Sequence, residues 1–167
     1  LPARSSRELN EAAGYLQHII DHYDALAERT AFVHPHASSW HSASLSSILK
    51  RSCEAEDGAY VELNLPHGER CLDATGGYRG DWTSPQLQRL VYHEWVRWFR
   101  NETAPARIRW TCCAQFMSSR AAIRRRSLDS WRSYLEASGS SDPPPYEYLW
   151  PALMDPDPLG GTCASMP

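Results

Sequence analysis

The sequence contains no apolar run long enough to cross a lipid bilayer, which requires about 18 or more consecutive apolar residues. Its 167 residues carry 17 lysines and arginines against 20 aspartates and glutamates, so the formal net charge is only −3. A chain whose main task is to cover a nucleic-acid backbone needs an excess of positive charge, which this chain lacks. We therefore expect neither a membrane span nor a nucleic-acid partner.

Several catalytic and cofactor signatures are also missing. No cysteines are spaced as Cys-x-x-Cys, so the spacing does not indicate a thiolate zinc site or a thioredoxin-like redox pair. No serine lies in the Gly-x-Ser-x-Gly pattern typical of α/β-hydrolase nucleophiles. The glycine-rich stretch from Asp73 to Asp81 has neither the Lys-Ser/Thr ending of a phosphate-binding loop nor the glycine spacing of a dinucleotide site. We interpret this stretch as a mobile loop.

Two features favour a secretory location. Asn101-Glu102-Thr103 is an N-glycosylation acceptor, and the Ala-Pro that follows it is typical of an exposed loop. The five cysteines are enough for two disulfides with one thiol left over. The N-terminal Leu1-Pro2-Ala3-Arg4 has no apolar signal region, so a signal segment either does not exist or lies outside this sequence. We expect a glycoprotein that is secreted or resides in the secretory pathway, the Golgi lumen included.

The length fits one domain with a sizeable core. Its aromatic residues are seven tryptophans and eight tyrosines but only three phenylalanines. Because tryptophan and tyrosine combine a large apolar surface with a polar atom, they suit a cleft for an organic ligand such as a sugar, and they suit ordinary packing equally well. We predict a single α/β domain over residues 1–154 and an irregular tail over residues 155–167.

Hydrophobic periodicity predicts helices and strands in close succession. The expected helices cover residues 6–28, 44–52 and 84–100, a short stretch around residue 123, and residues 128–135 and 146–150, the last limited by Pro151. The expected strands are Thr30–His36, Ala59–Leu65 and Ile108–Phe116. This succession favours a layered α/β architecture. We predict a small sheet of about three to four strands flanked by helices.

Three histidines lie within eight residues at the end of the first expected strand. If Thr30–His36 is extended, His34 and His36 share one face of the strand, and His41 returns from the following turn. Neutral imidazole is a common ligand for zinc and copper, and three protein ligands leave a position open for water or substrate. We therefore predict a divalent transition-metal site, zinc or copper, at His34, His36 and His41. The alternative is a polar loop whose histidines hydrogen-bond backbone carbonyls.

A second histidine pair, His18 and His22, has the i, i+4 spacing that zinc-binding helices use. Both residues lie off the apolar stripe of the first expected helix. We therefore expect them to face solvent rather than to bind a metal.

Four segments, in chain order, resemble a family of fungal secreted or Golgi-type proteins catalogued as a domain of unknown function. They are Tyr15-Leu16-Gln17-His18-Ile19-Ile20-Asp21-His22-Tyr23-Asp24, then Phe32-Val33-His34-Pro35-His36 with Ser39-Trp40-His41, then Cys112-Cys113-Ala114-Gln115-Phe116 with Ser119-Arg120, and Glu147-Tyr148-Leu149-Trp150. The resemblance covers most of residues 7–154. It implies similarity to glycosyltransferases with a nucleotide-sugar α/β fold, and hence a truncated glycosyltransferase-A-like architecture. In that analogy the histidines occupy the place where acidic residues usually hold a divalent metal and the donor diphosphate.

The sequence departs from the family pattern in two places. Family members usually begin with an additional strand and helix that would supply part of a nucleotide pocket, and this sequence starts after them. The region from Cys71 to Trp82 also diverges from the usual cysteine and proline pattern. The first departure puts donor-sugar binding in doubt, and the second leaves a changed substrate or a lost activity open.

Three carboxylates are candidates for general acid or base catalysis: Glu147, which the resemblance singles out, and Asp73 and Asp81 of the glycine-rich loop. Glu62 is a weaker candidate. For Glu147, the alternative is a carboxylate near a helix N-terminus, where the helix dipole favours negative charge.

Trp40, Gln115 and Arg120 are candidate substrate-binding residues. Trp40 lies between two of the histidines and suits the wall of a pocket, although a core aromatic would look the same. Gln115 and Arg120 are of the residue types that orient an oxygen-rich substrate or an anion, while a plain salt bridge would also explain Arg120.

These residues suggest a metal-dependent enzyme of fungal secreted or secondary metabolism, of a transferase-like or a cyclase/oxidase type, that acts on a small oxygenated organic molecule. Zinc would lower the pKa of a bound water or polarise a carbonyl, and copper would support redox chemistry. Two alternatives remain. One is a non-catalytic module that binds a glycan or another small molecule on the same scaffold. The other is an inert secreted domain with a structural metal.

Overall fold

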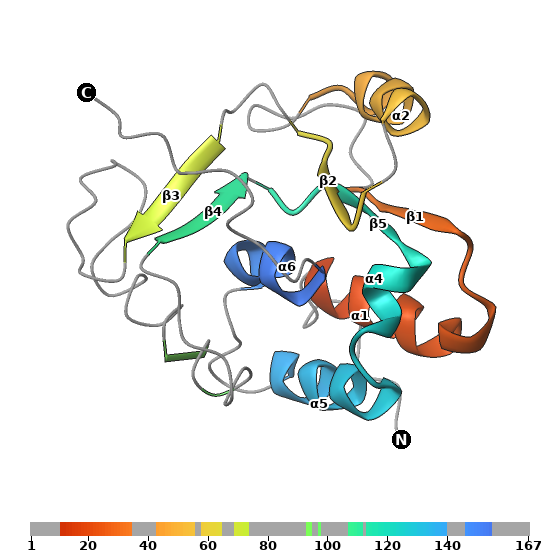
Figure 1. The fold of residues 1–167 in the computed structure, drawn as a ribbon, viewed down its shortest axis with the longest axis vertical. Coiled ribbons are helices and arrows are strands. Elements are labelled where there is room, and N and C mark those ends of the chain that lie inside the picture. Colours follow the sequence, from red (N-terminus) through yellow and green to blue (C-terminus); the bar gives the residue numbers. More distant parts are fainter. Residues whose placement is uncertain are drawn as a thin grey trace.

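The computed structural model describes residues 11–34, 43–55, 58–64, 69–73, 93–94, 97, 107–111, 113–139 and 146–154. The helices are α1 (Glu11–Asp21), α2 (Leu45–Glu54), α4 (Arg120–Arg124), α5 (Leu128–Ser138) and α6 (Tyr146–Met154), with a 3-10 turn at Tyr23–Ala25. The strands are β1 (Arg29–Phe32), β2 (Tyr60–Glu62), β3 (Glu69–Asp73), β4 (Arg107–Thr111) and β5 (Phe116–Ser119). Figure 1 shows their arrangement.

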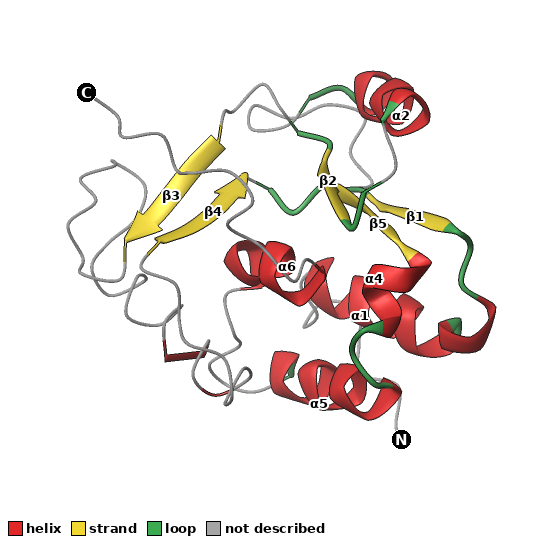
Figure 2. Cartoon of the chain, viewed as in Figure 1, coloured by secondary structure: helices red, strands yellow, loops and turns green. Residues whose placement is uncertain are grey.

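The strands form two antiparallel sheets (Figure 2). The first has the order β1-β5-β2, with Phe32 opposite Phe116 and Val61 opposite Met117. The second is a separate pair, β3 and β4. The expected mixed α/β class with a small sheet flanked by helices is therefore confirmed.

The alternation along β5 divides the core between the two faces of the three-stranded sheet. Phe116 lies in a large cluster together with buried residues of α1, α5 and α6, among them Leu16, Ile19, Trp131, Leu149 and Trp150. Met117 lies in a smaller cluster with Ile48 of α2 and with Leu63. The sheet is thus covered by α2 on one face and by the other long helices on the opposite face, where α1 packs along α5.

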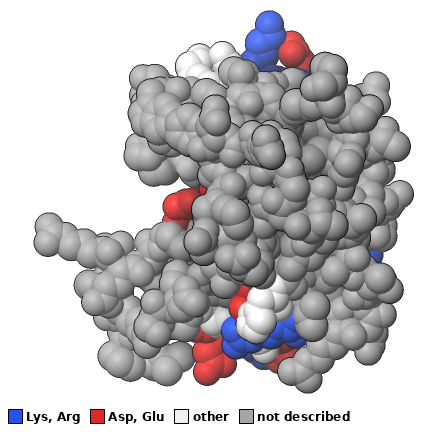
Figure 3. Space-filling view, turned by 90° about the vertical axis from the view of Figure 1, so that its left-hand side faces the viewer, with Lys and Arg blue, Asp and Glu red and all other residues white. Residues whose placement is uncertain are grey.

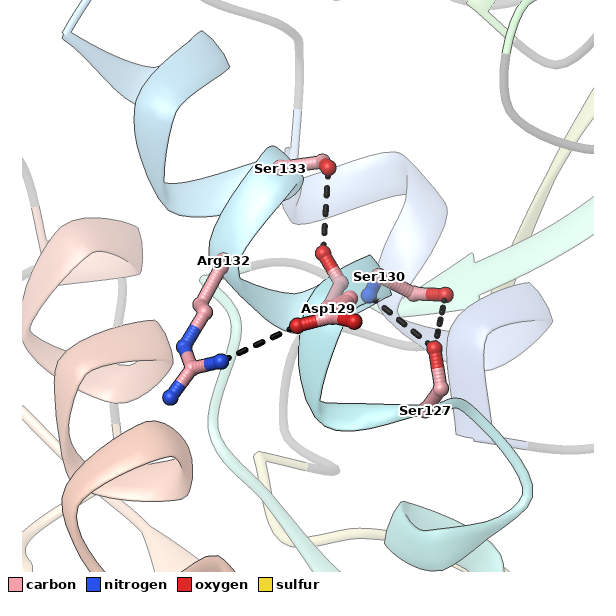
Figure 4. Close-up of polar contacts among 5 residues, drawn as sticks. All are labelled: Ser127, Asp129, Ser130, Arg132 and Ser133. Atoms are coloured by element: carbon pink, nitrogen blue, oxygen red, sulfur yellow. Dashed lines mark hydrogen bonds and ion pairs between the residues drawn. The ribbon is translucent and has the colours of Figure 1, made fainter.

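Serine side chains fix the starts of several helices. Ser44 is the N-cap of α2, and Ser127 is the N-cap of α5. Ser127 Oγ accepts a hydrogen bond from the Ser130 backbone at 3.2 Å, and in the next turn Arg132 donates to Asp129 at 3.0 Å (Figure 4). An N-cap serine favours a helix start because it accepts a hydrogen bond from a backbone N–H that the helix leaves unpaired. The observed starts of α2 and α5 confirm the expected starts to within a residue.

The expected strand Ile108–Phe116 is in fact two strands, β4 and β5. Between them Cys113 has φ 78° and Ala114 has φ 45°. A left-handed backbone cannot continue an extended strand, so the chain turns before β5 begins. The prediction of one strand was wrong because its sequence carries no glycine or asparagine to mark the turn.

The expected strand Thr30–His36 is also shorter than predicted. β1 ends at Phe32 because its partner β5 begins at Phe116, and the chain before Phe116 has turned away. His34 therefore lies beyond the strand. The prediction that His34 belongs to the first strand was therefore wrong, and strand alternation does not determine the direction of its side chain. His36 lies outside the described residues.

Three further boundaries differ from the predictions. α1 ends at Asp21 and gives way to a 3-10 turn, whereas a helix to about Glu28 was expected. β3 was not predicted, and it makes Asp73 the last residue of a strand rather than the first of a loop. α6 continues through Pro151 to Met154. The last four residues of α6 are all buried, and this burial compensates for the hydrogen bond that the proline removes.

The remaining expectations are tested only in part. Within the expected helix at residues 84–100, the structure describes His93, Glu94 and Arg97, and all three are helical. The expected tail at residues 155–167 lies outside the described residues. Of the cysteines, Cys113 is in a disulfide and Cys53 is a free, exposed thiol. No helix in the described part of the chain has the length and apolar character needed to span a membrane.

Candidate functional site

A buried glutamine holds His34 in place. Gln115 comes immediately before β5 and is only 2% exposed. Its side-chain Oε1 accepts a hydrogen bond from the backbone N–H of His34 at 3.3 Å. The imidazole Nε2 of His34 is itself shielded from solvent. The Gln115 amide therefore continues the β1–β5 pairing beyond the last backbone pair and fixes the chain at His34.

A buried asparagine does the same for Ala43. Asn64 follows β2, has no exposed surface, and accepts a hydrogen bond from the backbone N–H of Ala43 through Oδ1 at 2.9 Å. A backbone N–H requires an acceptor, so the bond also fixes which end of the amide points toward Ala43. The amide of Asn64 thereby holds the residue that precedes the N-cap of α2.

These two amides, hereafter the amide anchors, lie at the same end of the three-stranded sheet. The backbone N–H of Leu63 donates to the backbone carbonyl of Gln115 at 3.0 Å, which joins β2 and β5 just beyond their last strand pair. Gln115 and Asn64 are thus on neighbouring strand ends. They hold the two ends of the segment over residues 35–42, which lies outside the described residues.

The turn before β5 is strained and is held by a carboxylate. Residues with left-handed backbones other than glycine cost on the order of 1–3 kcal/mol each, and Cys113 and Ala114 are two in succession. The Cys113 N–H donates to Glu147 Oε1 of α6 at 2.8 Å. Since Cys113 and Ala114 are both buried, the surrounding structure determines this turn. Strain of this kind is common where a protein positions functional groups.

Aromatic rings pack around Phe32 and Phe116, the last strand pair before His34 and Gln115. The Phe32 and Phe116 rings lie 4.9 Å apart, centroid to centroid, and Trp150 lies 5.2 Å from Phe116. Tyr15 contacts Phe32 at 5.1 Å, and burial raises the pKa of its hydroxyl well above the usual range. This buried aromatic cluster packs the ends of β1 and β5 against α1 and α6.

The structure places the predicted site residues in three groups. His34 and Gln115 are in contact, and Glu147 binds the adjacent turn. Arg120 follows β5 whereas Gln115 precedes it, so the two lie at opposite ends of this strand. Asp73 ends β3 opposite Arg107.

The other predicted site residues are His36, Trp40, His41 and Asp81, and all four lie outside the described residues. Among the residues that the structure does describe, no group of three histidines, cysteines or carboxylates is placed to hold a metal ion. The histidine site therefore stays a prediction.

Sequence reasoning missed Asn64. In the expected strand Ala59–Leu65 the apolar Val61, Leu63 and Leu65 alternate with Tyr60, Glu62 and Asn64, a pattern that predicts a solvent-facing Asn64. The strand instead ends at Glu62, and Asn64 is fully buried. A buried amide carries no periodic signal, and only its partner at Ala43 explains it.

His18 on α1 and His22 directly after that helix are both exposed, as expected. Their ring centroids are 4.6 Å apart. The pKa of His18 is lowered from its usual 6.5, first because partial burial disfavours the charged ring and second because His22 is a like charge, while Asp21 acts in the opposite direction. Between the lowered pKa and 6.5, the unfolded chain binds more protons. The contribution of His18 to stability is therefore complete above this window and is lost as the pH falls through the folded-state pKa.

We expect an NMR titration of the imidazole C–H signals to give a midpoint for His18 below about 6.5. Replacing His22 with asparagine removes the like charge and should raise that midpoint. The matched control His93→Asn, at a 75% exposed side chain, should not move it. A wild-type midpoint at or above the usual value would contradict the assignment.

Among the described residues, acidic and basic side chains lie next to one another in several places. On the face in Figure 3, red and blue side chains of the described residues lie next to one another at the top and at the lower edge. Beneath the surface, the buried carboxylate of Glu94 lies 3.5 Å from Arg97 and 3.3 Å from His93.

A family model described as protein of unknown function, DUF3431, matches residues 3–160. No curated protein and no solved structure matches the chain.

Proposed function

The chain belongs to the DUF3431 family, and we propose that it is a metal-dependent enzyme that acts on a small oxygenated organic molecule. The observation that supports this proposal most is that both ends of the segment over residues 35–42 are held by buried amides at one end of the sheet. This segment carries His36, Trp40 and His41, and it begins directly after His34. Functional residues are often carried on loops that a rigid scaffold positions.

His34, His36 and His41 are the metal ligands in this proposal. His34 fits the role because its backbone is tied to Gln115 and its Nε2 is withdrawn from bulk water. A ligand that is held in place before the metal arrives loses less conformational freedom on binding. Bound zinc or copper would supply Lewis-acid or redox chemistry.

The other residues have supporting roles. Gln115 and Asn64 are positioning residues, because their buried side-chain oxygens accept hydrogen bonds from the backbone N–H groups of His34 and Ala43 at the two ends of the segment. Glu147 positions the strained turn in front of Gln115. Trp40 would contact the substrate, while Asp73 and Asp81 are the candidates for proton transfer. The transferase-like ancestry, a fungal secreted or secondary metabolism and a secretory location stay predictions from the sequence.

The proposal is tested by titrating zinc and copper separately into protein that has been stripped with a chelator and carries no histidine tag. We expect one equivalent of one metal to bind per chain. His34→Ala, His36→Ala and His41→Ala should each weaken that binding by at least about tenfold. The control His22→Ala removes an exposed imidazole and should leave the affinity unchanged.

Two results would contradict the proposal. One is a wild-type protein that binds neither metal stoichiometrically. The other is a metal whose affinity falls equally in the three variants and in His22→Ala, because that outcome indicates nonspecific binding to surface histidines.

A further inference from the structure

A disulfide bond is attached to the strained turn in front of β5. Cys113 is disulfide-bonded and only 7% exposed. The turn lies in the connection from β4 to β5 (Figure 1). The cross-link is a third restraint on Cys113, besides its burial and the hydrogen bond from its N–H to Glu147. Cys53 is a free thiol, so the second cysteine of the bond is Cys71, Cys112 or Cys163.

The turn adjoins the amide anchor that holds His34. Cys113 and Ala114 have left-handed backbones, and Gln115 follows them directly. On its other side Gln115 is fixed, because Phe116 begins β5, pairs with β1 and has no exposed surface. A change of backbone conformation at the turn therefore acts on Gln115 before it reaches the strand.

The hydrogen bond between Gln115 and His34 is sensitive to such a change. Its length of 3.3 Å, from Gln115 Oε1 to the His34 backbone nitrogen, is slightly beyond the usual range of about 2.7–3.2 Å. The corresponding bond from Ala43 to Asn64 is 2.9 Å long, and Asn64 follows β2 rather than the turn. A movement of the turn should therefore weaken the first anchor more than the second.

Breaking the disulfide would disturb the turn directly. Two sulfur atoms that are no longer bonded must move apart, because unbonded atoms cannot remain at a bonding distance. Cys113 is buried, and a close-packed interior has little free space for that movement. Left-handed residues other than glycine persist only where the surroundings impose them, so loss of one restraint favours relaxation of Cys113 and Ala114.

We propose that the Cys113 disulfide is a redox switch for the amide anchor at His34. A dithiol donates two electrons and two protons: the S–S bond breaks, both cysteines become thiols, and the dithiol closes into its own disulfide. The turn then relaxes, Gln115 moves away from His34, and the chain at His34 is released. Reoxidation reverses each step. The switch acts on the scaffold alone, so it operates whether or not a metal binds.

The test is amide hydrogen exchange of the full chain, followed residue by residue by NMR before and after reduction with dithiothreitol. The His34 amide should exchange at least about tenfold faster in the reduced protein, as for the loss of one hydrogen bond. The Trp131 amide donates to the Ser127 carbonyl in α5, and its unchanged exchange would show that the fold persists. Oxidised dithiothreitol should restore slow exchange at His34.

Two variants separate this bond from other thiol chemistry. Cys113→Ser should show fast exchange at His34 without reductant, and dithiothreitol should change it no further. Cys53→Ser removes the free thiol and should behave as the wild type in both states. If Cys113→Ser does not fold, the comparison of the reduced and oxidised wild type decides the question.

Three results would overturn the proposal. The first is a bond that cannot be reduced in the folded protein, or whose reduction leaves exchange at His34 unchanged. The second is an equal acceleration at His34 and Trp131, which indicates general unfolding. The third is a folded Cys113→Ser protein that keeps the slow exchange of the wild type.

Discussion

Replacing Phe116 with alanine is expected to lower the free energy of unfolding by about 3–5 kcal/mol, the range for removing a large aromatic side chain from a core. Phe116 has no exposed surface. Its ring lies 4.9 Å from Phe32, 5.0 Å from Tyr60 and 5.2 Å from Trp150, so one side chain joins β1, β2 and α6. The loss should appear in urea denaturation as a lower midpoint with an unchanged slope.

Leu49→Ala provides the matched control for the core variant. Leu49 is 48% exposed on α2, so its truncation should change stability by no more than about 0.5 kcal/mol. A Phe116→Ala protein as stable as Leu49→Ala would show that packing of the aromatic cluster does not stabilise the ends of the strands.

Replacing Glu147 with alanine should cost roughly 1–3 kcal/mol of stability, because the buried N–H of Cys113 then loses its acceptor. Glu147→Gln keeps an acceptor oxygen but loses the charge. Since charged hydrogen bonds are about twice as strong as neutral ones, its cost should be about half that of the alanine variant. Both costs are measured by denaturant unfolding.

The same pair of variants tests the positioning role of Glu147. A positioning residue predicts that Glu147→Gln keeps most of the metal affinity while Glu147→Ala loses part of it, because only the latter releases the turn. If both variants are equally destabilised, the hydrogen bond from Cys113 does not hold the turn, and the positioning role is refuted.

The parts of the fold that sequence predicted are those with local causes. The starts of α2 and α5 were predictable because Ser44 and Ser127 act on backbone groups three residues away. The start of β5 at Phe116 was not predictable from the local sequence. It follows the turn at Cys113 and Ala114, which is held by Glu147, 34 residues from Cys113 along the chain.

The site shows the same division. His34 and Gln115 were both selected as site residues because of their side-chain chemistry. They are 81 residues apart, and no pattern in either segment indicates that the Gln115 side-chain amide binds the backbone N–H of His34. The partner of Ala43 was missed for the same reason, because strand alternation placed Asn64 on the outside. Buried amides at strand ends follow from tertiary packing, which single-sequence periodicity does not contain.

The most direct test of the account is X-ray absorption spectroscopy of the metal-loaded, untagged protein, because it counts the atoms bound to the metal. The account predicts three imidazole nitrogens, at about 2.0–2.1 Å if the metal is zinc, and their number should fall in His34→Ala. A shell of sulfur atoms at about 2.3 Å, or one of oxygen atoms alone, would contradict it.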